Sequence, residues 1–121
     1  MHVLIWWLDG GHRLSSQVRN LFRDPDTTIL VSAASAWEIA IKSAAGKMDA
    51  GPLIDGFENE IEQEGFVELP ILARHAVRAG LLSGPNKDPF DRMLAAQALT
   101  ENVPLISRHT HFDSYAVRRI W

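Results

Sequence analysis

Three acidic side chains, Asp88, Asp91 and Glu38, have the type and spacing to do chemistry. Asp88 is placed to cap a helix within the stretch 86–108, and Pro89 is placed to open that helix. Asp91 lies one turn further on, so both aspartates can project from the same helix end. A cluster of carboxylates can hold a hard cation such as Mg²⁺ or Mn²⁺, which can activate water against a phosphodiester.

The same acids also have a purely structural interpretation. Carboxylates in a first helical turn accept free backbone N–H groups and oppose the helix dipole, so Asp-Pro-x-Asp is a good capping sequence in any protein. Glu38 lies three residues after Ser35, which predicts a capping box at the start of a helix over 35–45. From these residues alone, both interpretations stay open.

The composition restricts the classes of function. A chain of 121 residues fits one domain with one core, and its formal net charge of −3 supplies no general positive field for nucleic acid. A polyanionic substrate would therefore need bound cations or a local basic patch. The absence of cysteine excludes disulfides and thiolate metal sites. The apolar run 3–8 is too short to cross a membrane and lacks the features of a signal peptide, so we expect a cytoplasmic protein.

Hydrophobic periodicity predicts helices that alternate with strands. The run 3–8 fits a buried strand or a short buried helix. After it we expect, in order, a helix capped by Ser15 or Ser16, a strand over 27–33 buried on both faces, a helix over 35–45 with Trp37, Ala40, Ile41 and Ala44 facing inward, a helix opened by Pro52, a strand over 66–69, helices over 72–82 and 89–101, a strand over 105–106, a loop over 109–115 and an edge strand over 117–121. This pattern indicates an α/β sandwich with a mostly parallel sheet, in which ligands bind at the carboxyl ends of the strands.

Three motifs, taken in their order and spacing, resemble a known family. They are VSAASAWEIAIKSAAGKM (31–48), LPILARHAVRAGLL (69–82) and DPFDRMLAAQAL (88–99), and HVLIWWL (2–8) resembles the segment that follows the first strand of that family. The chain resembles PIN-domain ribonucleases of the VapC toxin type. The resemblance implies a PIN-like three-layer sandwich, with a central mostly parallel sheet flanked by helices, in a single domain over residues 1–121.

The resemblance also implies a function. It implies a metal-dependent endoribonuclease toxin that cleaves RNA with Mg²⁺ or Mn²⁺, forms a homodimer and is neutralised by a cognate antitoxin. Glu38 and Asp91 match two of the invariant acids of the family, and Asp88 matches an acid frequent in this subgroup. These three residues are the candidate catalytic and metal-ligating residues. The alternative is a catalytically impaired PIN-like module that acts by binding antitoxin or RNA.

Two positions depart from the family pattern. The first acid of the family ends a strand just before the segment that matches residues 2–8, which leads us to expect a shortened chain. Alternatively, residues 2–8 occupy the strand position and bring Asp9 to the pocket. Because a gap in a sheet would leave backbone groups unpaired, we expect residues 2–8 to pair into the sheet or a second copy to cover the gap. At the position of the fourth acid the chain has His109.

Several further side chains have two interpretations each. His109 and His111 are candidate metal ligands or solvated surface. The arginines could contact RNA phosphates or be ordinary surface charge, and this applies to Arg92, Arg108, Arg118 and Arg119. The tryptophans are interpreted as core or dimer-interface residues rather than base-stacking platforms, and this applies to Trp6, Trp7 and Trp37. Ser32 and Ser35 could bond a metal-bound water or Glu38, although helix capping is favoured for Ser35.

Overall fold

Helices and short parallel strands alternate along the chain in the computed structural model, which describes all of residues 1–121. The elements are α1 (His2–Leu8), α2 (Ser16–Arg23), β1 (Leu30–Ser32), α3 (Ala33–Ala44), α4 (Gly51–Asp55), α5 (Phe57–Gln63), β2 (Val67–Leu69), α6 (Ala73–Leu81), α7 (Pro89–Glu101), β3 (Leu105–Ile106), the 3₁₀ helix η1 (Thr110–Tyr115) and β4 (Arg119–Ile120). The predicted α/β class is confirmed. None of these helices has the length and apolar content needed to cross a lipid bilayer.

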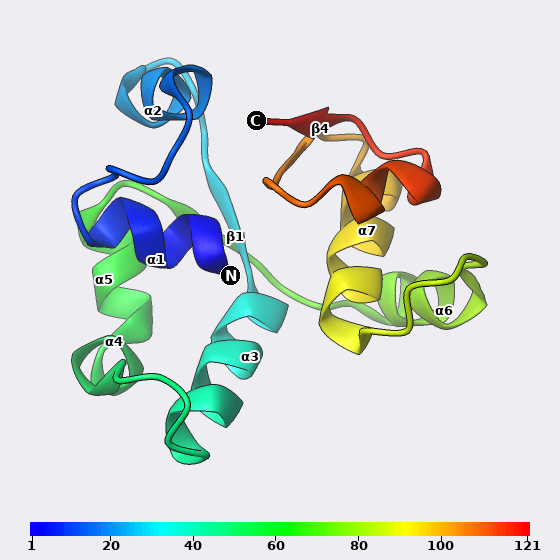
Figure 1. The fold of residues 1–121 in the computed structure, drawn as a ribbon, viewed down its shortest axis with the longest axis horizontal. Coiled ribbons are helices and arrows are strands. Elements are labelled where there is room, and N and C mark those ends of the chain that lie inside the picture. The colour runs from blue at the N-terminus through cyan, green and yellow to red at the C-terminus, as the bar shows by residue number, and fades with distance from the viewer.

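The four strands form two separate parallel pairs. β1 pairs with β2, with Leu30 opposite Val67, and β3 pairs with β4, with Leu105 opposite Arg119. In Figure 1, β1 lies with α1 to α5 on one side of the molecule, and β4 lies with α6 and α7 on the other. The second edges of β1 and β3 have no strand partner. An apolar groove of about 340 Å³, lined by residues of both strands, lies between the two pairs.

Residues 2–8 form the helix α1 and pair with no strand, so the expectation that they enter the sheet is wrong. Of the two structures that the apolar run fits, the chain adopts the short helix. A helix satisfies its own backbone groups, and here it buries Leu4 in the larger core while the rings of Trp7 and Phe22 stack at 4.9 Å. Asp9 ends α1 as an exposed residue and does not line the pocket that holds the other acids.

Helix α3 begins earlier than its sequence predicts. Ser32, the last residue of β1, is the N-cap, and its hydroxyl accepts a hydrogen bond from the Ala34 N–H at 3.0 Å. Ser35 therefore lies inside the helix, and the predicted capping box between Ser35 and Glu38 is wrong. The predicted strand over 27–33 is shorter at both ends: it begins at Leu30, and the cap at Ser32 ends it.

This earlier start is accompanied by a different buried face on α3. Ile39 is fully buried, whereas Trp37 and Ile41 are 57% and 45% exposed. Ala40 and Ala44 are exposed as well, so the prediction that these four side chains face inward is wrong. Glu38 lies on the buried side, next to Ile39, which is unusual for a carboxylate and calls for a partner.

Other elements agree with the sequence or differ locally. Ser15 caps α2, and Asp88 caps α7, which ends at Asn102 in a left-handed conformation as predicted. The single helix expected after Pro52 is two short helices, α4 and α5. The loop expected over 109–115 is the 3₁₀ helix η1, which buries Phe112 and Tyr115.

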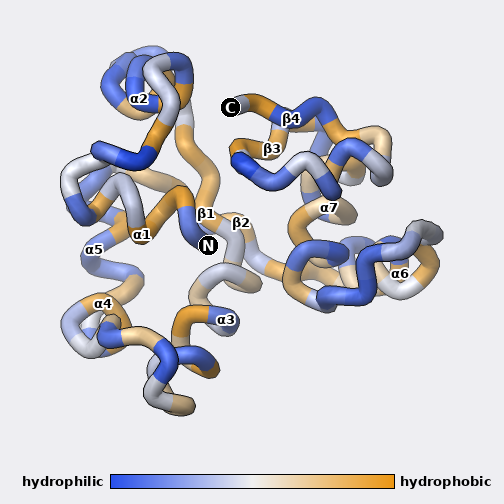
Figure 2. The backbone as a smooth tube through the Cα atoms, viewed as in Figure 1, coloured by the Kyte–Doolittle hydropathy of each residue, from blue (hydrophilic) through white to orange (hydrophobic).

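The hydrophobic core is divided in the same way as the strands. The larger cluster consists of Leu4, Val31, Ile39, Ala50, Leu53, Ile61 and Phe66, and the smaller one of Ala95, Phe112 and Tyr115. In the tube of Figure 2, apolar segments at β1 and β3 lie near the middle of the molecule. A buried polar link joins the two sides: Gln97 on α7 accepts a hydrogen bond from the Ser32 hydroxyl and donates to the Pro70 carbonyl at 3.2 Å.

A second polar link holds α6 to the end of α7. The fully buried His75 accepts the Leu72 N–H on Nδ1 at 3.0 Å, so the proton of the neutral ring is on Nε2. His75 Nε2 lies 2.7 Å from Glu101 Oε1 and donates to it. The hydrogen bond from His75, followed by one from Arg74, lowers the pKa of the Glu101 carboxyl.

Candidate active site

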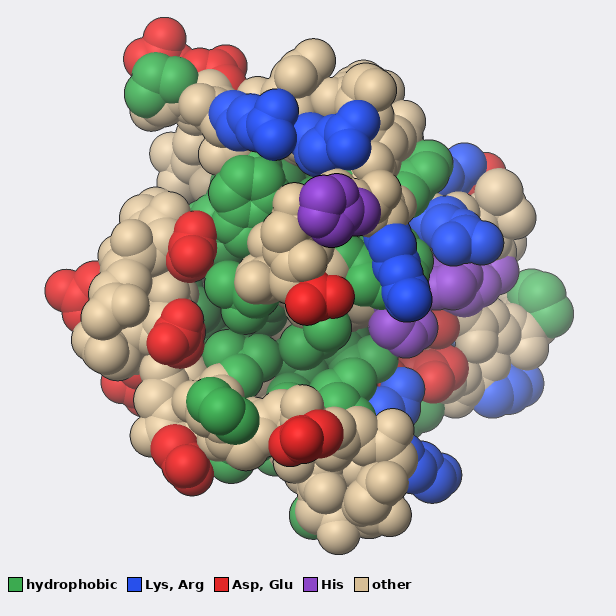
Figure 3. All heavy atoms as spheres, turned by 60° about the vertical axis from the view of Figure 1, so that its left-hand side comes forward, with side chains coloured by type: hydrophobic (Ala, Val, Ile, Leu, Met, Phe, Trp, Pro, Cys, Tyr) green, Lys and Arg blue, Asp and Glu red, His purple; other side chains and the backbone are tan.

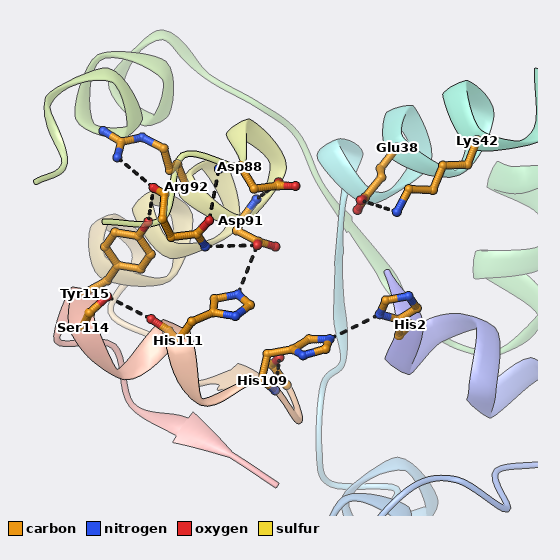
Figure 4. A network of polar contacts seen from close by, with 12 residues as sticks. His2, Glu38, Lys42, Asp88, Asp91, Arg92, His109, His111, Ser114 and Tyr115 are labelled. Atoms are coloured by element: carbon orange, nitrogen blue, oxygen red, sulfur yellow. Dashed lines mark hydrogen bonds and ion pairs between the residues drawn. The ribbon is translucent and has the colours of Figure 1, made fainter. Parts of the chain in front are cut away.

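The three predicted acids line one pocket. Glu38 lies on α3, Asp88 is the N-cap of α7, and Asp91 lies in the first turn of α7. All three border a cavity of about 150 Å³. Figure 4 shows the carboxylates of Glu38 and Asp91 turned toward the same space from two helices. The fold therefore brings together acids that are far apart in the sequence.

Asp88 has the capping role that its sequence context predicts. Its Oδ1 accepts the Asp91 N–H at 3.0 Å, while its own N–H donates to the side-chain oxygen of Asn86 at 3.1 Å. Asp88 is exposed at the mouth of the pocket. Capping uses one carboxylate oxygen and leaves the other without a hydrogen-bond partner in the protein.

Asp91 is oriented by two neighbours. Asn86 Nδ2 donates to Asp91 Oδ2 at 3.1 Å, and His111 Nε2 lies 3.1 Å from the same oxygen. Both contacts use Oδ2, so the carboxylate is fixed in rotation and Oδ1 stays available to a ligand in the pocket. Asn86 and His111 come from different elements, the loop before α7 and η1, which makes the orientation of Asp91 a tertiary feature.

Glu38 is almost fully buried and has a cationic partner. Its Oε2 lies 3.0 Å from Lys42 Nζ, one helical turn further along α3. The amino group of Met1 is also near: burial lowers the pKa of this group, and the charges of Glu38 and Asp91 act to raise it. Lys42 thus balances the charge of Glu38 within the chain.

The loop before α7 is held in place by Tyr115, whose role the sequence did not reveal. The Asn86 carbonyl accepts hydrogen bonds from the Tyr115 hydroxyl at 2.9 Å and from Arg92 Nη1 at 3.3 Å. Arg92 Nη2 also donates to the Leu82 carbonyl. Gly84, with a φ of +131°, packs against the Tyr115 ring, where an added Cβ would lie 3.3 Å from Cε1. The sequence Gly-Pro-Asn indicates a turn at this place, because Asn favours turns in which its side chain accepts a hydrogen bond from the backbone N–H two residues further along the chain.

Basic side chains and histidines lie among the acids around the pocket. His2, Lys42, Arg108, His109 and His111 line it together with the acids. His109, at the position of the fourth acid of the family, stacks on His111 and contacts no carboxylate. Figure 3 shows histidine and basic side chains gathered along one side of a hollow with an apolar floor. Among these side chains Arg108 offers a positive charge that no acid of the chain pairs with, whereas Lys42 pairs with Glu38 and burial lowers the pKa of His2.

Four of the side chains considered for the site have other partners. Arg118 donates to the Asn102 carbonyl at 3.2 Å, and Arg119 pairs with Asp113 at 2.8 Å, which raises the pKa of Arg119 and lowers that of Asp113. Neither arginine lines the pocket. Arg92 holds the loop before α7, as described above. Ser32 bonds Gln97 and the Ala34 N–H rather than Glu38.

The acidic side chains of the pocket are of the type that binds a divalent cation, but they do not lie close enough together to coordinate one. Carboxylate oxygens are the ligands that Mg²⁺ and Mn²⁺ prefer, and Glu38 and Asp91 each keep one oxygen without a protein partner. No three His, Asp or Glu side chains converge closely enough to hold a metal ion. Lys42 would have to leave Glu38 for this carboxylate to serve as a ligand with both oxygens.

Fold and pocket together define an α/β protein in which the helices α3 and α7 bring carboxylates to one cavity. A family model described as PIN domain matches residues 2–118, and the chain belongs to this family. PIN domains are generally nucleases, and those nucleases usually use divalent metals. No curated protein and no solved structure matches the chain.

Proposed function

We propose that the chain is a metal-dependent endoribonuclease of the VapC toxin type, which hydrolyses RNA phosphodiester bonds and is neutralised by a cognate antitoxin. The observation that carries this proposal is the pocket that Glu38 and Asp91 share, which Arg108 also lines. Membership in the PIN family supports the nuclease chemistry. A homodimer is part of the proposal, by resemblance to the VapC type.

Each group of the pocket has a distinct task in this proposal. Glu38 and Asp91, assisted by Asp88, would hold Mg²⁺ or Mn²⁺ through their free oxygens, which requires the two helices to bring these acids closer together than they are in this structure. The cation, when bound, supplies charge neutralisation and lowers the pKa of water. Arg108 draws the phosphodiester into the pocket, because it places an unpaired positive charge beside the acids. Asn86 and His111 keep the Asp91 carboxylate from rotating.

The experiment is RNA hydrolysis by the purified chain. A labelled single-stranded RNA is incubated with the protein and either Mg²⁺ or Mn²⁺, with or without EDTA. We expect cleavage that EDTA abolishes and added metal restores. Expression of the chain in a bacterial host should slow growth, and co-expression of an antitoxin should restore it. Intact RNA at every metal concentration would contradict the nuclease proposal.

The pairing of both acids within the chain favours a second function. Because Lys42 neutralises Glu38 and His111 contacts Asp91, the pocket can persist without a cation. A catalytically impaired PIN-like module that acts by binding RNA or antitoxin fits this arrangement. RNA that binds in EDTA and stays intact in Mn²⁺ would select this second function over the first.

The role of Asn86 gives a prediction with a readout separate from folding. Serine at this position can still accept the Asp88 N–H but cannot reach Asp91, so Asn86→Ser should free the Asp91 carboxylate to rotate. We expect RNA cleavage to fall about tenfold, the lower range for a lost orienting partner, with little change in Tm. Asn59→Ser, on the exposed face of α5, is the control and should match the wild type. Equal cleavage by Asn86→Ser and the wild type would show that the orientation of Asp91 does not depend on this amide.

A further inference from the structure

A row of five aromatic rings runs from Asp91 along the rim of the pocket. His111 and His109 stack with ring centroids 5.3 Å apart and an interplanar angle of 15°. His109 lies 5.6 Å from His2, which in turn stacks on Trp6 at 5.6 Å and 19°. Trp121 meets the Trp6 ring edge-on at 6.0 Å. We name these residues the ring row.

The ring row begins at the candidate acids and crosses the molecule. His111 Nε2 is 3.1 Å from Asp91 Oδ2, and Figure 4 shows His111, His109 and His2 following one another from α7 toward α1. The rings come from three distant parts of the chain: α1, the segment around η1 and the residue after β4. Such a row is therefore made by the fold and not by local sequence.

Core formation does not account for these rings. Neither tryptophan belongs to either hydrophobic cluster or packs against one as a partly buried neighbour, and among the histidines only His111 meets a core ring, with its centroid 4.6 Å from that of Phe112. The three histidines are exposed, and Trp6 and Trp121 keep part of their surface in solvent. Aromatic rings that stay accessible beside a pocket are available to a ligand.

A positive charge accompanies the ring row. The Arg108 guanidinium lies 5.9 Å from the centroid of the Trp6 ring. Arg108 is exposed, and it makes no hydrogen bond or ion pair within the protein, in contrast to Arg118 and Arg119. Its charge is therefore free to meet a phosphate next to the rings.

We propose that the ring row and Arg108 form a binding site for the unpaired bases of single-stranded RNA. The inference deepens the proposed function, on which it rests, by specifying the form of the substrate. Every base presents a π-face, so aromatic rings bind a single strand with little sequence preference, and an adjacent arginine binds its backbone. Bases inside a duplex are stacked on each other and cannot reach the rings. A strand held along the ring row delivers a phosphodiester to Asp91.

The chain contains a matched comparison for Trp6. Trp37 is 57% exposed and meets Phe90 edge-on at 4.9 Å, so it too is a solvent-accessible tryptophan with one aromatic neighbour. It does not line the pocket, and no arginine lies over its ring. Replacement of Trp37 by leucine therefore removes an exposed indole from the protein without touching the ring row.

The test measures RNA binding by fluorescence anisotropy in EDTA, with a short labelled oligoribonucleotide and with the same strand in a duplex. We expect Trp6→Leu to raise the Kd at least about fivefold, the loss typical of one stacked base, and Trp37→Leu to leave it unchanged. The duplex should bind more weakly than the single strand. Arg108→Gln, at an exposed and unpaired position, should also raise the Kd and should reduce its dependence on salt by about one counterion.

Each outcome bears on the ring row separately from catalysis, because no cleavage occurs in EDTA. Binding that depends on Trp6 supports the ring row even if added metal produces no cleavage, which would contradict only the nuclease. Equal affinities of the wild type and Arg108→Gln, or of single strand and duplex, overturn the proposal. The absence of RNA binding by the wild type also overturns it and leaves the rings as a surface for protein contacts. If Trp6→Leu has a lower Tm than the wild type, the RNA affinity of Arg108→Gln decides whether the proposal stands.

Discussion

Asp91→Asn should lose at least about a hundredfold in the rate of metal-dependent RNA cleavage, as should Glu38→Gln. Each change keeps the shape of the side chain and removes the negative charge that a divalent cation requires. Asp91 is oriented by Asn86 and His111 and has one free oxygen, so the amide would present a weaker ligand at the same place. Initial rates at saturating Mn²⁺ measure the effect, and thermal unfolding verifies that the variants fold.

Two exposed acids serve as matched controls for these variants. Asp55→Asn on α4 and Glu58→Gln on α5 remove the same charges on surfaces that do not line the pocket. We expect both to cleave RNA at the rate of the wild type. If Asp91→Asn or Glu38→Gln cleaves equally well, the acids of the pocket act only in helix capping and ion pairing, and the nuclease must use other groups.

Gln97→Leu should lower the free energy of unfolding by about 2–3 kcal/mol. Leucine fills a similar volume, so the loss comes from the buried polar groups that the amide satisfies. Gln97 is 1% exposed; it accepts from the Ser32 hydroxyl and donates to the Pro70 carbonyl. Without the amide, the buried Ser32 hydroxyl loses its acceptor. Urea denaturation at equilibrium measures the change.

A double-mutant cycle with Ser32→Ala isolates the link between α7 and β1. The stability losses of the two single variants should add up to more than the loss in the double variant, because each single variant leaves the other partner unpaired. Gln17→Leu, at an exposed position on α2, should change stability by less than about 0.5 kcal/mol. Additive losses would show that the Ser32–Gln97 hydrogen bond contributes little to the joining of the two halves.

Local signals in the sequence predicted α7 well, because its cap and its first turn depend on neighbouring residues only. Asp88, Pro89 and Asn102 each have the backbone role that their residue type favours. The outcome differs at α3, where Glu38 reaches the pocket although the capping box proposed for it does not exist. Its place depends on the cap at Ser32 and on the face that α3 buries, and both are decided by packing.

Features that need distant contacts could not be predicted. The apolar run 3–8 fits a strand and a helix equally, and only its neighbours in space decide between them. The bond from Tyr115 to the Asn86 carbonyl joins residues from separate elements, as does the ring row. Exposure of Trp37 was mispredicted for the same reason, since hydrophobicity does not determine which side of a helix meets the core.

The division of the strands into two pairs has a consequence for the acids. Glu38 is carried by the half that contains β1, and Asp91 by the half that contains β3. No backbone hydrogen bonds between β1 and β3 fix the separation of the halves. The two carboxylates therefore belong to halves that no continuous sheet holds at a set distance. A molecule bound in the apolar groove would therefore change the distance between the two carboxylates.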